Sequence, residues 1–222
     1  YRVVGIVRRS AMEDKKLYNI QHLLDNTNLI IENGDVTDSS SIWRIVAQYK
    51  PDEFYNLAAQ SHVGASFTTP ESTLSINATG VINCLEAILP RMIEREKGQV
   101  VLMSSVTGYL GLPLFSPEYS ISKSAIIMIA RTYYDRLKFK NVKMQVVCPS
   151  FVDTGLMSKR IFNMPFLVPT EKAAKKIVKG MHSNKFEIAF PLPTVYFLKF
   201  VSMLPYKLQF WLAKFTMNRI RK

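Results

Sequence analysis

The residues of this chain with the clearest chemical potential are a serine, a tyrosine and a lysine, at Ser105, Tyr119 and Lys123. Tyr119 and Lys123 are four residues apart, so they share one face of a helix. A free phenol has a pKa near ~10 and is a poor acid or base at neutral pH unless a cation, here Lys123, stabilises its phenolate. The hydroxyl of Ser105 could then hold a carbonyl or alcohol while Tyr119 exchanges its proton. The spacing therefore predicts a proton-transfer site.

A tyrosine four residues before a lysine is a weak signal alone, and the chain contains a second such pair, Tyr134 and Lys138. The alternative for either pair is a solvated helix face. Tyr119 differs in what precedes it, because residues 99–103 are typical of a buried parallel strand and Ser105 follows directly. Open α/β sheets place their active sites at the carboxyl ends of such strands, which favours the Tyr119 pair.

Strand and helix patterns alternate along the whole chain. We expect strands at residues 2–7, 29–32, 53–58, 99–103, 143–148 and 185–190. We expect helices at residues 14–24, after a cap at Thr37 or Asp38, at 75–95, at 119–137, and from a cap at Thr170 to Gly180. This alternation predicts an α/β fold with a doubly wound parallel sheet.

The composition sets limits on this picture. A chain of 222 residues with 48% hydrophobic content can bury one substantial core, most simply as a single domain. Cys84 and Cys148 fall in apolar stretches and are expected to be reduced core residues. The three histidines lack the spacing of metal ligands, so no metal site is predicted.

Several ordered motifs carry a resemblance to a known family. They lie at residues 77–80, 98–105, 119–123 and 149–154. Together they resemble the signature of the short-chain dehydrogenase/reductase superfamily in its compact single-domain form. The resemblance implies that Ser105 polarises a carbonyl, that Tyr119 is the general acid or base, and that Lys123 lowers the tyrosine pKa and binds the ribose of a cofactor. It also implies that Asn77 supports a water relay. The alternatives are a helix N-cap for Asn77 and a strand-closing role for Ser105.

The same resemblance implies a set of cofactor contacts near residue 150. Pro149, Val152 and Thr154 would contact bound NADP, with Thr154 available to the nicotinamide carboxamide. Ser150 stands where the superfamily usually has glycine, and its side chain could crowd the nicotinamide.

The first 80 residues resemble a different branch of the superfamily, the GDP-mannose 4,6-dehydratase family. The matching motifs lie at residues 1–10, 34–40 and 50–63. This resemblance implies that Arg8 and Arg9 bind the 2′-phosphate of NADP, a task that suits the rigid bidentate guanidinium. A solvated loop is the alternative for these arginines. Further implied cofactor contacts are Asp35 and Val36 beside the adenine, and Leu57, Ala58 and Ala59 along the cleft.

Both branches open with a strand, a glycine-rich turn and a helix whose N-terminus holds the pyrophosphate. None of the nine glycines forms such a cluster, and Tyr1 falls where the second strand should be. We therefore expect a Rossmann-like dinucleotide-binding domain at 1–190 that lacks its first strand and phosphate-binding turn, followed by a basic amphipathic helical extension at 191–222. Either the sequence is a piece of a longer protein, which the missing initiator methionine favours, or the chain is a fragment that binds cofactor poorly. The strands at 2–7 and 53–58 would then have unpaired facing edges.

Part of the formal charge of +12 is local to the C-terminus. No acidic residue follows Glu187, while six lysines and arginines are interleaved with aromatic residues. An apolar stripe recurs at helical spacing at Leu208, Trp211, Leu212 and Phe215. Residues 194–222 are thus typical of a membrane-surface helix, or alternatively they cap the substrate pocket or pack against a partner subunit. Prolines interrupt the apolar run, so no spanning helix is expected, and no recognised nucleic-acid-binding module accompanies the charge.

Three functions are compatible with these patterns. The first is an NADP-dependent oxidoreductase acting on a small or apolar carbonyl or alcohol, with Tyr119 exchanging the proton. The second is a GDP-mannose 4,6-dehydratase-like nucleotide-sugar dehydratase. The active-site residues 104–107 oppose it, because they include no carboxylate. The third is a non-catalytic, membrane-associated binding module. A cytoplasmic location, peripheral at a membrane surface, and a homodimer through the Tyr119 helix complete the expectations.

Overall fold

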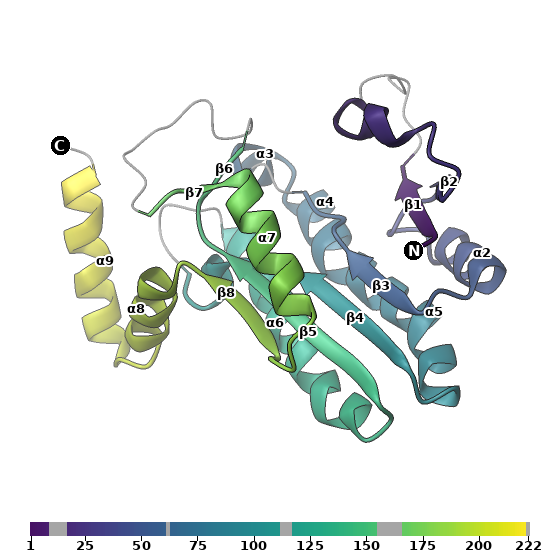
Figure 1. The fold of residues 1–222 in the computed structure, drawn as a ribbon. Coiled ribbons are helices and arrows are strands. Elements are labelled where there is room, and N and C mark those ends of the chain that lie inside the picture. The colour runs from purple at the N-terminus through teal and green to yellow at the C-terminus, as the bar shows by residue number, and fades with distance from the viewer. Residues whose placement is uncertain (9–16, 61–62, 112–116, 155–165, 221–222) are drawn as a thin grey trace.

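The computed structural model describes residues 1–8, 17–60, 63–111, 117–154 and 166–220. In these ranges every pair of strands is parallel, and helices pack against the strands (Figure 1). The predicted α/β fold with a parallel, Rossmann-like sheet is confirmed.

The larger sheet forms the centre of the molecule. Its strands, in spatial order, are β3 (Glu53–Asn56), β4 (Gly98–Met103), β5 (Val142–Pro149) and β8 (Glu187–Phe190). The helices that cover it are α5 (Gly80–Glu94), α6 (Pro117–Lys138) and α7 (Thr170–Met181). Leu102 and Val146 face the core under α5 and α6, whereas Val101 and Val147 face α7. Because both faces are covered, β4 and β5 each end in a continuous apolar run, at residues 100–103 and 146–149.

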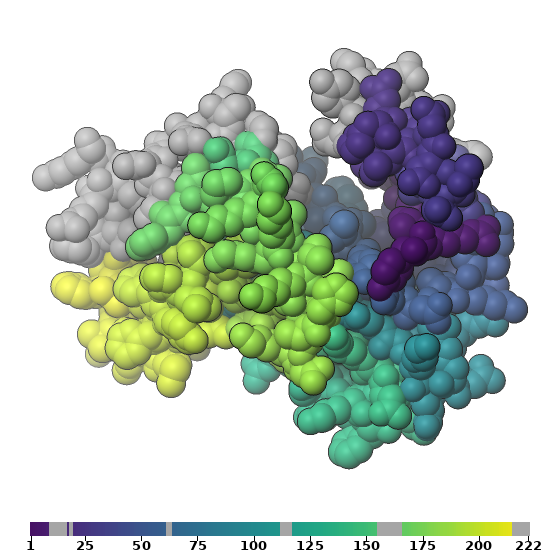
Figure 2. Space-filling model, viewed as in Figure 1, coloured from purple at the N-terminus to yellow at the C-terminus, as the bar shows by residue number. Residues whose placement is uncertain are grey.

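A second, two-stranded sheet holds β1 (Val3–Val7) and β2 (Leu29–Asn33). The described residues place no strand between β1 and β3, so each of these strands has one edge without a neighbour. Ile6 and Phe54 nevertheless pack against the same hydrophobic core. Figure 2 shows an opening beside the purple β1 segment. The gap lies where the sequence predicts that a strand is missing, and that prediction is confirmed.

The helix after β2 shows which of the two predicted residues caps its N-terminus. α2 (Ser39–Tyr49) begins after Asp38, whose Oδ1 accepts a hydrogen bond from the backbone N–H of Ser40 at 3.0 Å. Of the two caps considered, the structure therefore selects Asp38. The helix buries Ile42 and Val46 and so attaches the small sheet to the core.

The helix predicted at residues 75–95 is confirmed over residues 75–94, but it begins earlier than predicted and is not regular. The chain instead forms α3 (Val63–Thr68), α4 (Pro70–Leu74), a π-helical turn η2 (Ser75–Thr79) and then α5. Pro70 suits the first turn of α4, where its missing N–H costs nothing. A π turn inserts one extra residue into the helical ladder, and such turns often mark functional positions. Here it carries Asn77.

Other elements also differ from the expectations in their bounds or their type. β3 ends at Asn56 rather than Ala58, because the Asn56 side chain accepts the N–H of Ala58 at 3.1 Å and turns the chain. In the described part of residues 14–24 the helix is a 3₁₀ helix, η1 (Tyr18–Leu23). Thr170 does not cap α7: it is the first helical residue, and its hydroxyl donates to the Asp153 carbonyl. This contact joins α7 to a short parallel pair, β6 (Val152–Asp153) and β7 (Val168–Pro169).

The chain ends in two helices, α8 (Leu192–Ser202) and α9 (Tyr206–Ile220). Val195 and Leu198 of α8 pack against Val106, directly beyond β4. Within the described ranges, no helix has the length and apolar content needed to cross a bilayer. Cys84 and Cys148 are buried free thiols, as predicted. The domain boundary at residue 190 stays a prediction.

Candidate active site

Ser105 lies where the chain leaves β4, at the carboxyl end of the sheet. Its backbone is extended, and a 3₁₀ turn η3 (Val106–Gly108) follows. The Ser105 hydroxyl accepts a hydrogen bond from the backbone N–H of Thr107 at 3.3 Å and donates to the carbonyl of Pro149 at 3.4 Å. Because Pro149 ends β5, the predicted residues Ser105 and Pro149 meet at the carboxyl ends of adjacent strands, where parallel sheets form ligand sites.

Tyr119 belongs to the first turn of α6 and faces Ser105. Burial raises the pKa of the Tyr119 phenol, and a hydrogen bond with the Ser105 hydroxyl opposes this rise in part. The tyrosine therefore keeps its proton throughout the neutral range and is poised as an acid. The structure thus brings together the two hydroxyls that the sequence singled out.

Lys123 lies one turn further along α6, and its side chain is buried. Its ammonium nitrogen is 5.7 Å from the centre of the Tyr119 ring and donates to the carbonyl of Met103 at 3.2 Å. Burial lowers the pKa of Lys123 to about 8, an effect that Cys148 opposes. The ammonium thus donates to a backbone carbonyl, and the implied role of Lys123 in lowering the tyrosine pKa stays a prediction.

Asn77 connects the catalytic helix to the loop after β3. Its Oδ1 accepts from the backbone N–H of Gln60 at 2.7 Å, and its Nδ2 donates to Gln60 O at 3.2 Å and to Ser122 Oγ at 3.1 Å. Ser122 in turn donates to the carbonyl of Tyr119 at 2.8 Å. Asn77 is fully buried inside a helical segment, so the N-cap alternative is wrong, while the water relay stays a prediction.

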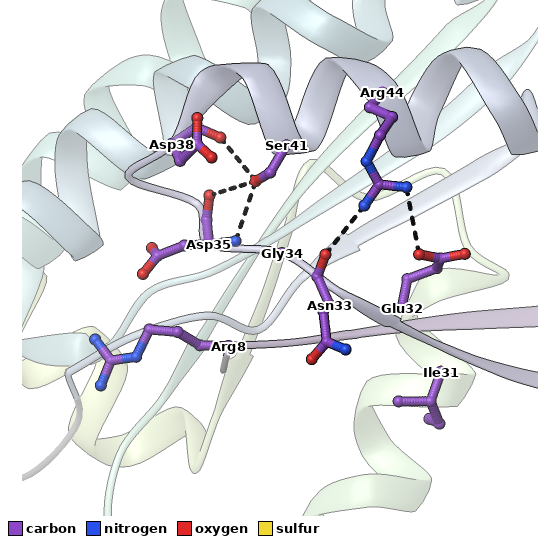
Figure 3. A pocket seen from close by; sticks show the side chains of 9 residues that line it. All are labelled: Arg8, Ile31, Glu32, Asn33, Gly34, Asp35, Asp38, Ser41 and Arg44. Carbon is purple, nitrogen blue, oxygen red and sulfur yellow. Dashed lines mark hydrogen bonds and ion pairs between the residues drawn. The ribbon is translucent and has the colours of Figure 1, made fainter. Parts of the chain in front are cut away.

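A cavity of about 720 Å³ opens at the carboxyl ends of β1 and β2. Figure 3 shows Arg8 and Asp35 at one end of it and Arg44 at the other. The Arg44 guanidinium lies 3.5 Å from the Glu32 carboxylate and donates to the Asn33 carbonyl at 3.2 Å. Arg8 is exposed, and among the described residues it has no ion pair. Of the two described cations that line the cavity, Arg8 is therefore the one that remains available to an anionic ligand.

The other implied cofactor residues lie in or after the strands β2, β3 and β6. Asp35 accepts the N–H and hydroxyl of Thr37 at 2.9 and 2.8 Å. Val36 packs against Gly80, where an added Cβ would lie 2.6 Å from the valine side chain. The remaining implied residues follow β3 or lie at or just after β6, namely Leu57, Ala58, Ala59, Val152 and Thr154. Arg9 and residues 155–165 lie outside the described residues.

Some polar atoms near the site were not singled out from the sequence. Within the described residues, buried oxygens without a hydrogen-bond partner include Thr107 Oγ1, Glu118 Oε2 and Ser150 Oγ. Buried polar groups are normally paired, so such atoms at a strand end are candidates for contact with a ligand or water. Each of these residues is next to, or two positions from, a residue predicted to belong to the site. Whether a polar atom is buried without a partner depends on packing, so the sequence could not have identified these atoms.

A polar network ties α8 to the active-site turn. The Tyr109 hydroxyl donates to Glu187 at 2.8 Å, and Lys199 of α8 pairs with the same carboxylate. The Lys199 ammonium also lies 4.9 Å from the centre of the Tyr109 ring. Since Tyr109 directly follows η3, the turn that begins at Ser105 is joined to the C-terminal helices.

The parallel sheet, the serine after β4 and the tyrosine–lysine pair on α6 define the fold of short-chain dehydrogenases. A short-chain dehydrogenase from Burkholderia cenocepacia, solved with NADP, matches with a TM-score of 0.74 at 15% identity, over 95% of this chain and 86% of that one. One from Streptomyces avermitilis matches with a TM-score of 0.71 at 23% identity, over 97% of this chain and 85% of that one.

Within that class, the chain belongs to the GDP-mannose 4,6-dehydratase family, whose model matches residues 1–147. The match passes residue 80 and includes Ser105, Tyr119 and Lys123. A GDP-mannose 4,6-dehydratase from Vibrio cholerae is 40% identical over 122 residues, which are 53% of this chain and 32% of that protein. An uncharacterized oxidoreductase from Myxococcus xanthus is 31% identical over 132 residues, 60% of this chain and 52% of that protein. The chain thus spans about a third of the Vibrio dehydratase.

Proposed function

We propose that the protein is an NADP-dependent oxidoreductase of the short-chain dehydrogenase type, acting on a small or apolar carbonyl or alcohol. The observation that carries the proposal is the meeting of Ser105, Tyr119 and Lys123 at the carboxyl ends of β4 and β5. The proposal is tested by NADPH oxidation with a panel of apolar ketones, using the protein with any preceding segment included. No turnover with the panel, together with tight binding of GDP-mannose, would overturn it.

In this mechanism the protein's own residues handle the proton. The Ser105 hydroxyl holds the substrate oxygen beside the Tyr119 phenol, which donates its proton as the carbonyl is reduced. Because burial raises the pKa of Tyr119, the acid form predominates near neutral pH and the phenol can donate its proton to the substrate oxygen. Lys123 places a cation behind the phenol and offers donors to a ribose. NADP, when bound, supplies or accepts the hydride.

The residues at the β1–β2 cavity fit the 2′-phosphate end of that cofactor. Arg8 is exposed at the cavity and has no ion pair within the described residues, as a phosphate ligand requires. We expect Arg8→Ala to weaken NADPH binding by about tenfold or more, since it removes a charge-assisted hydrogen bond, and to leave NADH binding nearly unchanged. Arg44→Ala is the matched control, because Arg44 lines the same cavity but is occupied by Glu32 and Asn33. The readout is nucleotide fluorescence; equal losses for both nucleotides would contradict the assignment.

Nucleotide-sugar dehydration is the second candidate, supported by membership of the GDP-mannose 4,6-dehydratase family. One acidic group also favours it. Glu118 directly precedes Tyr119, and its Oε2 is buried without a partner among the described residues. Residues 104–107 contain no carboxylate, and Glu118 on α6 is the acidic residue that would take its place beside Tyr119. Loss of water from GDP-mannose in the presence of the protein would support this candidate, and oxidation of NADPH by apolar ketones would support the first.

Two contacts with larger partners are part of the proposal. A homodimer through α6 is supported by Ile121 and Met128, which are 56% and 59% exposed on that helix. Peripheral membrane contact through residues 194–222 is supported by the exposed aromatic residues of α8 and α9. A non-catalytic, membrane-associated module stays the alternative, and NADPH binding without turnover would support it.

A further inference from the structure

The helix α8 is apolar on two opposite faces. One face is buried, with Val195, Leu198 and Val201 between 2% and 6% exposed. The other face holds large apolar side chains that are more than half exposed, namely Leu192, Tyr196, Phe197, Phe200 and Met203. Surface helices of water-soluble proteins normally carry polar residues opposite their buried stripe. The second apolar face of α8 therefore has no explanation in the packing of the described residues.

The beginning of α9 continues this exposed face. Tyr206, Phe210 and Trp211 are 75%, 69% and 62% exposed, and the rings of Tyr206 and Phe210 stack with centroids 6.2 Å apart. We call the exposed side chains of α8 and α9 the aromatic surface. It comprises Leu192, Tyr196, Phe197, Phe200, Met203, Tyr206, Phe210 and Trp211. Figures 1 and 2 show these helices at the end of the molecule away from β1 and β2.

The charged residues within α8 and α9 all have one sign. No acidic residue occurs after Glu187, and the carboxylate of Glu187 is itself paired with Lys199. Lys207 and Lys214 are exposed on α9 beside the aromatic residues. An apolar surface that includes tyrosine and tryptophan, on helices whose charged residues are all cations, matches the layered chemistry of a bilayer surface, where apolar chains lie beneath anionic headgroups.

We infer that the aromatic surface docks on an anionic lipid bilayer by shallow insertion of the α8 and α9 side chains, with Lys207 and Lys214 at the headgroups. The inference deepens the proposed peripheral contact and does not depend on the proposed redox activity. The opposite face of α8 packs on Val106, and Lys199 is tied through Glu187 to Tyr109. The bilayer would therefore be held at a fixed side of the Ser105 turn, which suits a substrate that dissolves in lipid.

Cosedimentation with vesicles tests the docking. The protein should sediment with vesicles that contain phosphatidylglycerol and much less with pure phosphatidylcholine. Phe200→Ser with Phe210→Ser should weaken binding on the order of tenfold or more, and Lys207→Gln or Lys214→Gln about fivefold each. The matched controls are Phe139→Ser, an 86% exposed phenylalanine on another part of the chain, and Lys172→Gln on α7, and both should bind as the parent does. Equal binding to both lipids, or equal losses in the controls, would overturn the inference.

The two tryptophans give a measurement that needs no destabilising change. Trp211 lies in the aromatic surface and Trp43 on α2 at the other end of the molecule. In Trp43→Phe protein, vesicles should shift the remaining emission to shorter wavelength and brominated lipids should quench it; in Trp211→Phe protein they should do neither. No response of Trp211 would overturn the inference. It would also be overturned if the variant with Phe200→Ser and Phe210→Ser changed from dimer to monomer while its vesicle binding stayed the same, since the surface would then join two copies of the chain. Because neither readout uses turnover, a failure here is distinct from a failure of the redox proposal.

Discussion

Replacement of Tyr119 by phenylalanine is expected to lower kcat for carbonyl reduction by about 10² to 10⁴, the usual contribution of a positioned general acid. The substitution removes one oxygen and keeps the ring, so the packing of α6 should be retained. The physical reason is the upward shift of the Tyr119 pKa by burial, which keeps the phenol protonated and able to donate near neutral pH. The KM for the nucleotide should change little, because the phenol acts on the substrate oxygen.

The chain supplies a matched control for this experiment. Tyr134 also stands four residues before a lysine on α6, but its ring packs edge-on against Phe186 with centroids 4.9 Å apart, far along the helix from the Ser105 turn. Tyr134→Phe should leave kcat unchanged. Steady-state rates with an apolar ketone and single-turnover rates of NADPH oxidation measure both variants. Equal rates for the Tyr119→Phe protein and its parent would remove Tyr119 from the chemistry.

The accuracy of the sequence predictions follows the range of the interactions involved. Ser105 and Tyr119 could be paired from sequence because a strand end and a helix face are local features, and parallel-sheet topology brings them together. The gap beside β1 was predictable from the resemblance, because both branches of the superfamily open with a strand and a glycine-rich turn for which this sequence has no match. The π turn at Asn77 was not, since it arises from a buried amide that bonds both Gln60 and Ser122, partners 17 and 45 residues away.

The same limit applies to charges and to partners. The sequence placed Lys123 beside Tyr119 but gave no sign that the ammonium would donate to Met103 O, because that carbonyl is brought close by the β4–α6 packing. Arg44 was not predicted at the β1–β2 cavity, since only the docking of α2 beside β2 brings it to Glu32. The aromatic stripe of α9 was visible as a pattern, whereas the second apolar face of α8 required knowledge of which side is buried.

Replacement of Lys123 by methionine is expected to abolish turnover and at the same time to stabilise the fold near pH 7. Lys123 is 3% exposed, and burial lowers its pKa from 10.5 to about 8. That shift corresponds to about 3 kcal/mol of unfavourable free energy when the lysine is charged. Loss of the hydrogen bond to Met103 O destabilises the variant by about 1 kcal/mol, so the net gain in the free energy of unfolding should be about 2 kcal/mol.

The pH dependence separates this charge effect from simple repacking. Because the folded-state pKa lies below the unfolded-state value, the cost of the charge is complete below about pH 8 and disappears as the pH rises toward 10.5. The advantage of the methionine variant, measured by urea unfolding, should therefore shrink across that window. Lys138→Met, at an exposed lysine on the same helix, should change stability by less than ~0.5 kcal/mol at any pH. A gain that is independent of pH would identify better packing as its cause, and a loss near pH 7 would mean that the buried ammonium is compensated. If the expected pattern is found, the protein keeps a cation beside Tyr119 that lowers its stability. A functional site carries such a cost in stability, whereas a purely structural helix would have no reason to keep it.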